Sequence, residues 1–258
     1  IMRSAFDLGC LIMQHAEDNE LSQNGMMNDG VIATKLGLQG IPEVAEKIII
    51  ERDLSLLEDF NCRYHISQIS SSKSLDVIEK KKDQIDFTTG VSINNLSLNE
   101  NDIGDFRTFL KLSPPLRTEE DRQSLIRGIN KDLIEVLVSD HKPEDEESKR
   151  LTFSQAATGA SGIETLLPLS LELFHNNSIK LPKIIKLLTS NPAKVLKVDK
   201  GNLSIGNDAD FCIVDINKPW IVKKEKMISK SKNTCIEDKK LQGKVTNTFV
   251  KGVELFKL

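Results

Sequence analysis

The 258-residue sequence lacks the features that mark several classes of protein. Its four cysteines lie far apart and form no Cys-x-x-Cys pair, which argues against a thiolate zinc knuckle and a disulfide framework. We therefore expect a reducing, cytoplasmic location. No apolar run reaches the ~18 residues of a membrane-spanning helix. The net charge of −3 gives no electrostatic reason to expect a nucleic acid or an anionic membrane as partner.

The composition is that of a soluble globular protein, with 39% hydrophobic and 28% charged residues. Short β-branched or apolar runs alternate with amphipathic segments, and no internal repeat interrupts them. This alternation predicts an α/β fold with a parallel sheet and right-handed crossovers. The expected strands are residues 8–14, 61–66, 87–91 and 133–138. The expected helices are residues 42–60, 73–82, 118–130, 163–175 and 182–188.

The character of the chain changes after Asp199. Residues 201–206 are rich in turn formers, and residues 211–216 and 245–256 are β-like. The intervening residues 221–242 are rich in lysine and weakly patterned, so we expect a flexible, solvated insertion there. The tail therefore reads as a small β subdomain.

Three ligand-type side chains follow three of the expected strands. These are His15, His65 and Asp140, and the chain holds only four histidines. In an α/β barrel the chemistry takes place at the carboxyl ends of the strands. Imidazole and carboxylate groups suit zinc. Purely structural roles for these residues stay open. Asp140 could cap a turn, and the histidines could be hydrogen-bonded core residues. His141 could be an outer partner of the metal or a turn residue.

Several motifs resemble those of dihydroorotases, in the order in which they occur there. They are His-Ala-Glu-Asp at 15–18, Tyr-His-Ile-Ser at 64–67, Leu-Ser-Pro-Pro-Leu-Arg at 112–117, Ser-Asp-His at 139–141 and Gly-Ile-Glu-Thr at 162–165. Residues 191–194 and 201–210 are similar to signatures of the wider amidohydrolase superfamily. The resemblance covers essentially the whole chain.

The resemblance implies a metal-dependent (β/α)₈ barrel with a small β subdomain. On that pattern, residues 1–198 are the second half of the barrel, strands five to eight. Residues 199–258 are then the C-terminal part of the subdomain. Ile1 is not an initiator, and we expect ~150–170 residues to precede it in a barrel of this size.

The implied reaction is the reversible, metal-assisted hydrolysis of dihydroorotate to N-carbamoyl-aspartate in pyrimidine biosynthesis. His15, His65 and Asp140 would bind one or two zinc ions, with the remaining ligands upstream of this chain. Asp140 would also act as the general base, and so be the catalytic residue.

The substrate-binding positions implied by the resemblance are Ser113, Glu144, Thr158 and Gly159. Ser113 stands where catalytic members have asparagine, and Glu144 where they have a histidine that pairs with the substrate carboxylate. Glu144 would repel that carboxylate unless Lys142 or Arg150 compensates its charge by a salt bridge. The departures leave two alternatives: a non-catalytic scaffold partner of aspartate transcarbamoylase, and another cyclic amidohydrolase such as an allantoinase or hydantoinase. A homo-oligomer is expected for the whole protein.

Overall fold

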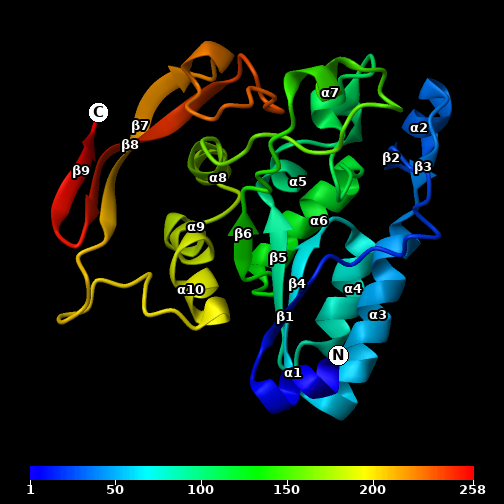
Figure 1. Cartoon of the computed structure of the whole chain (residues 1–258), viewed down its shortest axis with the longest axis horizontal. Helices are drawn as coiled ribbons and strands as arrows, with labels where there is room; N and C mark the ends of the chain where they lie inside the picture. The colour runs from blue at the N-terminus through cyan, green and yellow to red at the C-terminus, as the bar shows by residue number, and fades with distance from the viewer.

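A four-stranded parallel sheet organises the first half of the chain, as the computed structural model of residues 1–258 shows. The strand order is β1-β4-β5-β6, and every neighbouring pair is parallel. The strands are β1 Leu11–Gln14, β4 Arg63–Ile69, β5 Thr88–Ser92 and β6 Val136–Val138. Figure 1 shows them side by side in the middle of the molecule, with helices α3 and α4 packed beside them. The α/β prediction is confirmed.

The long helices fall where the sequence predicts them. They are α3 Glu43–Phe60, α4 Ser72–Lys81, α6 Glu119–Asn130, α8 Leu166–His175 and α9 Leu181–Leu188. A short helix, α10 Ser190–Leu196, follows α9 and is not among the expected helices. Helix α6 begins with a complete capping box, in which the side chains of Thr118 and Asp121 each accept from the other's backbone N–H. Ser71 caps α4 by accepting from the N–H of Ser74.

The remaining elements are short. They are α1 Met2–Leu8, β2 Met27–Asn28, α2 Val31–Leu36, β3 Gly40–Ile41, α5 Ile93–Ser97, α7 Glu146–Arg150 and three 3₁₀ turns, η1 Glu100–Ile103, η2 Thr108–Leu110 and η3 Lys224–Lys226. No helix is both long enough and apolar enough to cross a membrane.

The core lies between the sheet and its helices. Ile66 and Val91 from the strands are fully buried against Ile50, Leu54 and Ile78 from α3 and α4. Alternation along β4 sends Tyr64 toward the helices, where its hydroxyl donates to the Asp53 carboxylate. His65 therefore projects from the opposite face of the sheet.

The C-terminal part forms a separate antiparallel sheet of β7 Phe211–Ile221, β8 Lys240–Val250 and β9 Val253–Lys257. It packs beside α8, on the side of the molecule away from α3 (Figure 1). The expected division at residues 198 and 199 falls between α10 and this sheet, and the division into domains stays a prediction.

Two sequence-based expectations are wrong. The segment between β7 and β8 is not a solvated insertion: Val222, Cys235 and Ile236 are buried, and the Asn233 carbonyl accepts from the N–H of Ser161. Most of its lysines are exposed, while a few apolar residues pack into the protein. These apolar residues are too far apart to give a periodic pattern in the sequence. Strand β4 continues to Ile69 rather than ending at Ile66, which changes the placement of His65.

Candidate active site at the strand ends

The carboxyl ends of β1, β4, β5 and β6 lie at one edge of the sheet, because the four strands are parallel. His15 follows the last residue of β1 directly, and Asp140 follows β6 by two residues. Ser113 lies on the connection between β5 and β6. This edge therefore collects side chains from segments far apart in the sequence.

His15 is held by two partners. Its Nε2 lies 3.1 Å from Oε2 of Glu17 and 3.1 Å from Oγ of Ser113. The hydrogen bond with Glu17 raises the pKa of His15, burial opposes this, and the charges of Glu17, Glu46 and Asp140 add to the rise. The same hydrogen bond lowers the pKa of Glu17. While Nε2 donates to Glu17, only Nδ1 of His15 has a free lone pair for a metal.

Asp140 accepts a hydrogen bond from the side-chain amide of Gln68. The distance from Gln68 Nε2 to Asp140 Oδ1 is 2.9 Å. Burial raises the pKa of Asp140, and the Gln68 hydrogen bond and the charges of His15 and Lys142 partly offset this. The backbone of Asp140 is left-handed, with φ of 49°, a conformation that aspartate tolerates better than most residues. A carboxylate with a raised pKa is suited to receive a proton.

His65 does not lie at a strand end, which corrects the expectation. It pairs in register with Met13 of β1 and Thr88 of β5, inside β4. Its Nδ1 lies 2.8 Å from Oγ1 of Thr88, and the residue is 2% exposed. Burial, reinforced by the charge of Lys82, lowers the pKa of His65 to about 4. The imidazole is therefore neutral near pH 7.

A bulge explains why Gln68, rather than His65, reaches Asp140. Ile66 pairs with Thr89 and Ile69 pairs with Val91, so Ser67 and Gln68 together stand opposite Gly90. Such an extra residue redirects the side chains that follow it. A Cβ on Gly90 would lie 2.4 Å from the Ser67 carbonyl oxygen, so glycine is required beneath the bulge.

This chain does not by itself supply a complete zinc site. No group of three or more histidine, cysteine, aspartate or glutamate side chains is placed to hold one ion. The predicted convergence of His15, His65 and Asp140 is thus not observed. Their roles as metal ligands stay predictions.

The predicted substrate-binding residues lie on two different segments. Ser113 lies at His15, whereas Glu144, Thr158 and Gly159 lie on the segment after β6. The Gly159 N–H donates to the Lys111 carbonyl, 3.0 Å away, and its carbonyl accepts from Lys149 Nζ at 2.9 Å. Both backbone groups of Gly159 are therefore engaged within the protein. The roles of all four residues in substrate binding stay predictions.

The expected compensation of Glu144 is also absent. Arg150 pairs with Glu146 and Glu147 on its own short helix, at 2.6 and 3.1 Å. Neither Arg150 nor Lys142 forms a salt bridge with Glu144. Glu144 therefore lacks the expected salt bridge, although its charge acts on the nearby Lys149.

Three further residues of this region escaped sequence reasoning. They are Glu17, Gln68 and the buried Lys149. Lys149 is 1% exposed and donates to the carbonyls of Ala157 and Gly159, and burial lowers its pKa to about 8. In the sequence Lys149 lies in a charged run typical of a surface loop, so nothing indicated that its side chain is buried. Gln68 stands three residues after His65 in an extended run, which is the only signal that pointed to it.

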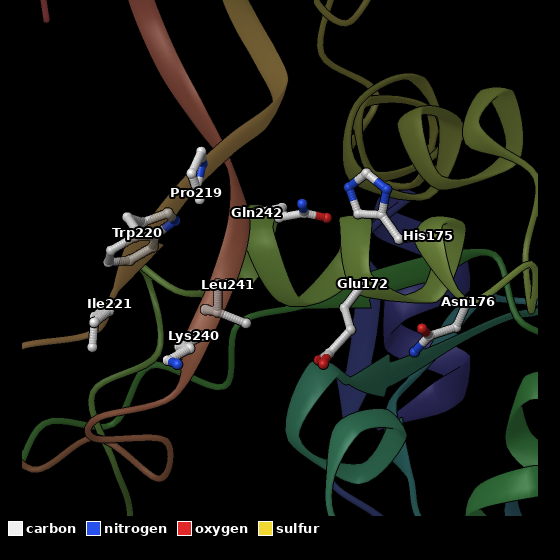
Figure 2. Close-up of a pocket in the computed structure, with 9 residues that line it drawn as sticks. All are labelled: Glu172, His175, Asn176, Pro219, Trp220, Ile221, Lys240, Leu241 and Gln242. Atoms are coloured by element: carbon white, nitrogen blue, oxygen red, sulfur yellow. The ribbon is translucent and has the colours of Figure 1, made fainter.

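A second hollow lies away from the strand ends. A cleft of about 590 Å³ opens between α8 and strands β7 and β8. Figure 2 shows Glu172 and His175 of α8 and the following Asn176 on one side of the cleft, with Trp220 of β7 and Gln242 of β8 on the other. None of the predicted metal ligands lines this cleft.

The sequence is similar to those of curated dihydroorotases. It is 41% identical to the dihydroorotase of Ehrlichia canis (strain Jake) over 247 residues, 95% of this chain and 55% of that protein. It is 38% identical to the dihydroorotase of Anaplasma phagocytophilum (strain HZ) over 262 residues, 99% of this chain and 59% of that protein. The chain thus spans a little over half the length of these relatives.

The fold is similar to those of solved cyclic-amide hydrolases. The L-hydantoinase (dihydropyrimidinase) of Arthrobacter aurescens superposes with a TM-score of 0.86 at 25% identity, over 100% of this chain and 59% of that one. The dihydropyrimidinase of Brevibacillus agri NCHU1002 superposes with a TM-score of 0.85 at 19% identity, over 99% of this chain and 59% of that one. At this identity the likeness bears on the fold alone. The amidohydrolase family model matches residues 1–255. The chain therefore belongs to the amidohydrolase family.

Proposed function

We propose that this chain is part of a dihydroorotase-like cyclic amidohydrolase, which hydrolyses dihydroorotate to N-carbamoyl-aspartate and closes the ring in reverse. The observation that carries the proposal is the 41% identity to a named dihydroorotase across 95% of the chain. Identity to the solved hydantoinases is lower, 25% or less. This difference favours dihydroorotase over the hydantoinase alternative.

The proposal also includes the fold, in which the sheet of this chain is one part of a barrel. Strands β1 and β6 are the edges of an open four-stranded sheet, and Leu8 and Met13 beside or within β1 are largely exposed. An exposed apolar edge is costly in water. In the proposal these strands are the second half of a (β/α)₈ barrel, closed by strands from a longer protein, and residues 199–258 are part of its β subdomain.

In the proposed active site Asp140 is the catalytic base. Its half-buried carboxylate, with a raised pKa, takes a proton from the water that attacks the ring carbonyl carbon and delivers it to the ring nitrogen as the C–N bond breaks. A divalent metal, as the family generally uses, would polarise the amide carbonyl. His15 and Asp140 at the strand ends could hold it, and so could His65, whose Nε2 is free while its Nδ1 stays hydrogen-bonded to Thr88. Zinc as that metal is part of the proposal.

The substrate contacts are proposed for Ser113, Glu144, Thr158 and Gly159. Ser113 is supported by its place beside His15, at the mouth of the sheet. Glu144 forms no salt bridge within the chain, although its charge acts on Lys149, so it would repel the substrate carboxylate and weaken binding. A cytoplasmic location is proposed because all four cysteines are free.

The non-catalytic scaffold is the second candidate. It is favoured by the Gln68 amide on Asp140 and by the lack of a three-donor group. In that case the barrel would assist assembly with an enzyme such as aspartate transcarbamoylase, as a homo-oligomer or otherwise, and would turn over nothing.

The experiment compares substrates with the whole purified protein at saturating zinc. Steady-state hydrolysis is measured for dihydroorotate and for hydantoin at equal concentrations. The proposal expects dihydroorotate to be the preferred substrate. Preference for hydantoin would assign the protein to the other class of cyclic amidohydrolases, and no hydrolysis of either would favour the scaffold.

A further inference from the structure

The segment after β6 contains a buried ammonium group that bridges two peptide carbonyls. Lys149 lies in α7, is buried and forms no salt bridge. Its Nζ donates to the carbonyl oxygen of Ala157 at 2.7 Å and to that of Gly159 at 2.9 Å. These two residues are the neighbours of Thr158 in the sequence. The side chain of Lys149 therefore fixes the chain on both sides of Thr158.

Thr158 itself has unpaired backbone groups. Its N–H and its carbonyl form no hydrogen bond within the chain, and the residue is half-buried. The groups beside them are all engaged: the Ala157 N–H donates to the Ser148 carbonyl at 3.1 Å, and the Gly159 N–H donates to the Lys111 carbonyl at 3.0 Å. One donor and one acceptor thus stay available on a segment that is otherwise held by hydrogen bonds.

Gly159 lies between the two segments that lead to the candidate site. The Lys111 carbonyl that accepts from Gly159 is two residues before Ser113. On the other side, a Cβ on Gly159 would lie 2.6 Å from the carbonyl oxygen of Lys142, which is two residues after Asp140. The φ of Gly159 is 138°, which a residue with a side chain rarely adopts. The free backbone groups just before Gly159 are therefore close to the strand ends.

Packing alone does not require an ammonium group at this place. Removing an ammonium from water is unfavourable, and an uncharged side chain of similar length, such as methionine, would fill the space without that cost. What the ammonium adds is several hydrogen-bond donors on one atom. Asn233, between β7 and β8, also donates to the Gly159 carbonyl, at 3.3 Å. The Ala157 carbonyl accepts from Lys149 alone.

We propose that Lys149 is a positioning residue for the substrate: by bridging the carbonyls of Ala157 and Gly159, it holds the free N–H and carbonyl of Thr158 in place for a cyclic amide. A ring amide offers one carbonyl acceptor and one N–H donor, which complement these two groups. The inference rests on the proposed function for the nature of the substrate. Lys149 makes no contact with the substrate in this account, so its loss should affect binding more than the chemical step.

The first test is the steady-state hydrolysis of dihydroorotate by the whole protein with zinc, for the natural sequence, Lys149→Met and Lys149→Arg. Lys149→Met removes the donors, so the KM should rise about tenfold while kcat stays within about threefold of the natural value. Lys149→Arg keeps donors for both carbonyls, and its KM should stay closer to the natural one. A role in packing predicts the reverse order of the two variants. That order, or a natural KM in folded Lys149→Met, would overturn the proposal.

The matched control is Lys183→Met. The Nζ of Lys183 likewise donates to two backbone carbonyls, those of Ile129 and Asn130, both at 2.9 Å, but at the C-terminal end of α6. This variant is expected to leave the KM for dihydroorotate unchanged. A rise equal to that of Lys149→Met would show that the loss of any such lysine disturbs the site, and the specific role of Lys149 would be lost.

A second measurement needs no turnover. Amide hydrogen exchange is followed at Thr158 in the whole protein with zinc, with and without dihydroorotate. Since the Thr158 N–H has no partner in the chain, dihydroorotate should slow its exchange at least about tenfold in the natural protein and much less in Lys149→Met. If Lys149→Met does not fold, the natural protein decides the matter. Exchange at Thr158 that dihydroorotate does not slow would overturn the proposal.

The outcomes separate this inference from the proposed function. Slowed exchange at Thr158 that Lys149→Met abolishes, in a protein that hydrolyses no dihydroorotate, would support the role of Lys149 and count against the enzyme. Hydrolysis with the same KM in the natural protein and in Lys149→Met would support the enzyme and overturn the inference.

Discussion

The imidazole of His15 and the hydroxyl of Ser113, 98 residues apart in the sequence, lie 3.1 Å apart in the structure. One follows β1 and the other lies on the connection after β5. Their contact joins the segment that follows β1 to the connection that follows β5, and it brings together two positions that the sequence nominated for different tasks. A substrate at this mouth would meet the Ser113 hydroxyl and the His15 ring together.

The departures at Ser113 and Glu144 predict a weak dihydroorotase. A glutamate about 4 Å from the substrate carboxylate opposes binding by ~4 kcal/mol at an effective dielectric near 20, on the order of a thousandfold in affinity. The double variant Ser113→Asn with Glu144→His should raise kcat/KM for dihydroorotate in the whole protein with zinc. A natural protein already above ~10⁴ M⁻¹s⁻¹ would refute the argument from Glu144.

Gly90→Ala should distort the bulge of β4. Its Cβ would meet the Ser67 carbonyl oxygen at 2.4 Å, and that oxygen cannot move without the strand. We expect a loss of about 1–3 kcal/mol in the free energy of unfolding, measured with urea. Gly30→Ala is the control, because only side-chain atoms at 3.6 Å or more lie near its Cβ position. Equal stability of the two variants would contradict the bulge argument.

Arg117 is expected to stabilise the fold and not to bind substrate. It is 3% exposed, donates to Asn28 Oδ1 at 2.9 Å and to Ser70 Oγ at 3.1 Å, and Ser70 in turn donates to the buried Glu46. Arg117→Ala should cost about 3–5 kcal/mol, because it leaves the buried acceptors Asn28 Oδ1 and Ser70 Oγ without their donor and opens a cavity in the fold.

The control for Arg117 is the exposed Arg150. Its ion pairs lie at the surface, so Arg150→Ala should change the free energy of unfolding by less than about 1 kcal/mol. Urea unfolding of both variants decides the matter. If Arg117→Ala were as stable as Arg150→Ala, the network around Glu46 would have little effect on stability.

Because of Lys149, we expect the free energy of unfolding to increase at alkaline pH. Its pKa is lowered by burial to about 8, below the ordinary value of 10.5, so the unfolded chain binds more protons between these two values. The contribution of Lys149 to the free energy of unfolding therefore increases as the pH rises from about 8 to 10.5. Urea unfolding at both ends of this window should show the increase in the natural protein and a smaller one in Lys149→Met. An identical pH dependence would show that Lys149 titrates normally.

The sequence anticipated the parallel sheet and most helices because their signals are local. The capping residues of α6 and the apolar stripe of α3 need only neighbouring residues to be recognised. The placement of His65 was wrong for a different reason. Where β4 ends is set by pairing with β5 and by the bulge above Gly90, and neither is visible within one strand.

The residues of the candidate site could also be predicted only where their signals are local. His15 and Asp140 were placed at the strand ends because motif and strand end coincide, whereas Ser113 was nominated by the motif alone; their roles stay predictions. Gln68 was missed because its importance depends on Asp140, 72 residues later and on a strand that is not its neighbour. Lys149 was missed because nothing in a charged run distinguishes the one lysine that turns inward.

The most direct test of the account is the rate of dihydroorotate hydrolysis by Asp140→Asn in the whole protein with zinc. Asparagine keeps the shape of the side chain and an oxygen for the Gln68 amide, but it cannot act as a base. The account predicts that the natural protein hydrolyses dihydroorotate and that the variant, equally stable to urea, is slower by about 10²–10⁴-fold. A variant with the natural rate would contradict the assignment of the active site to the strand ends.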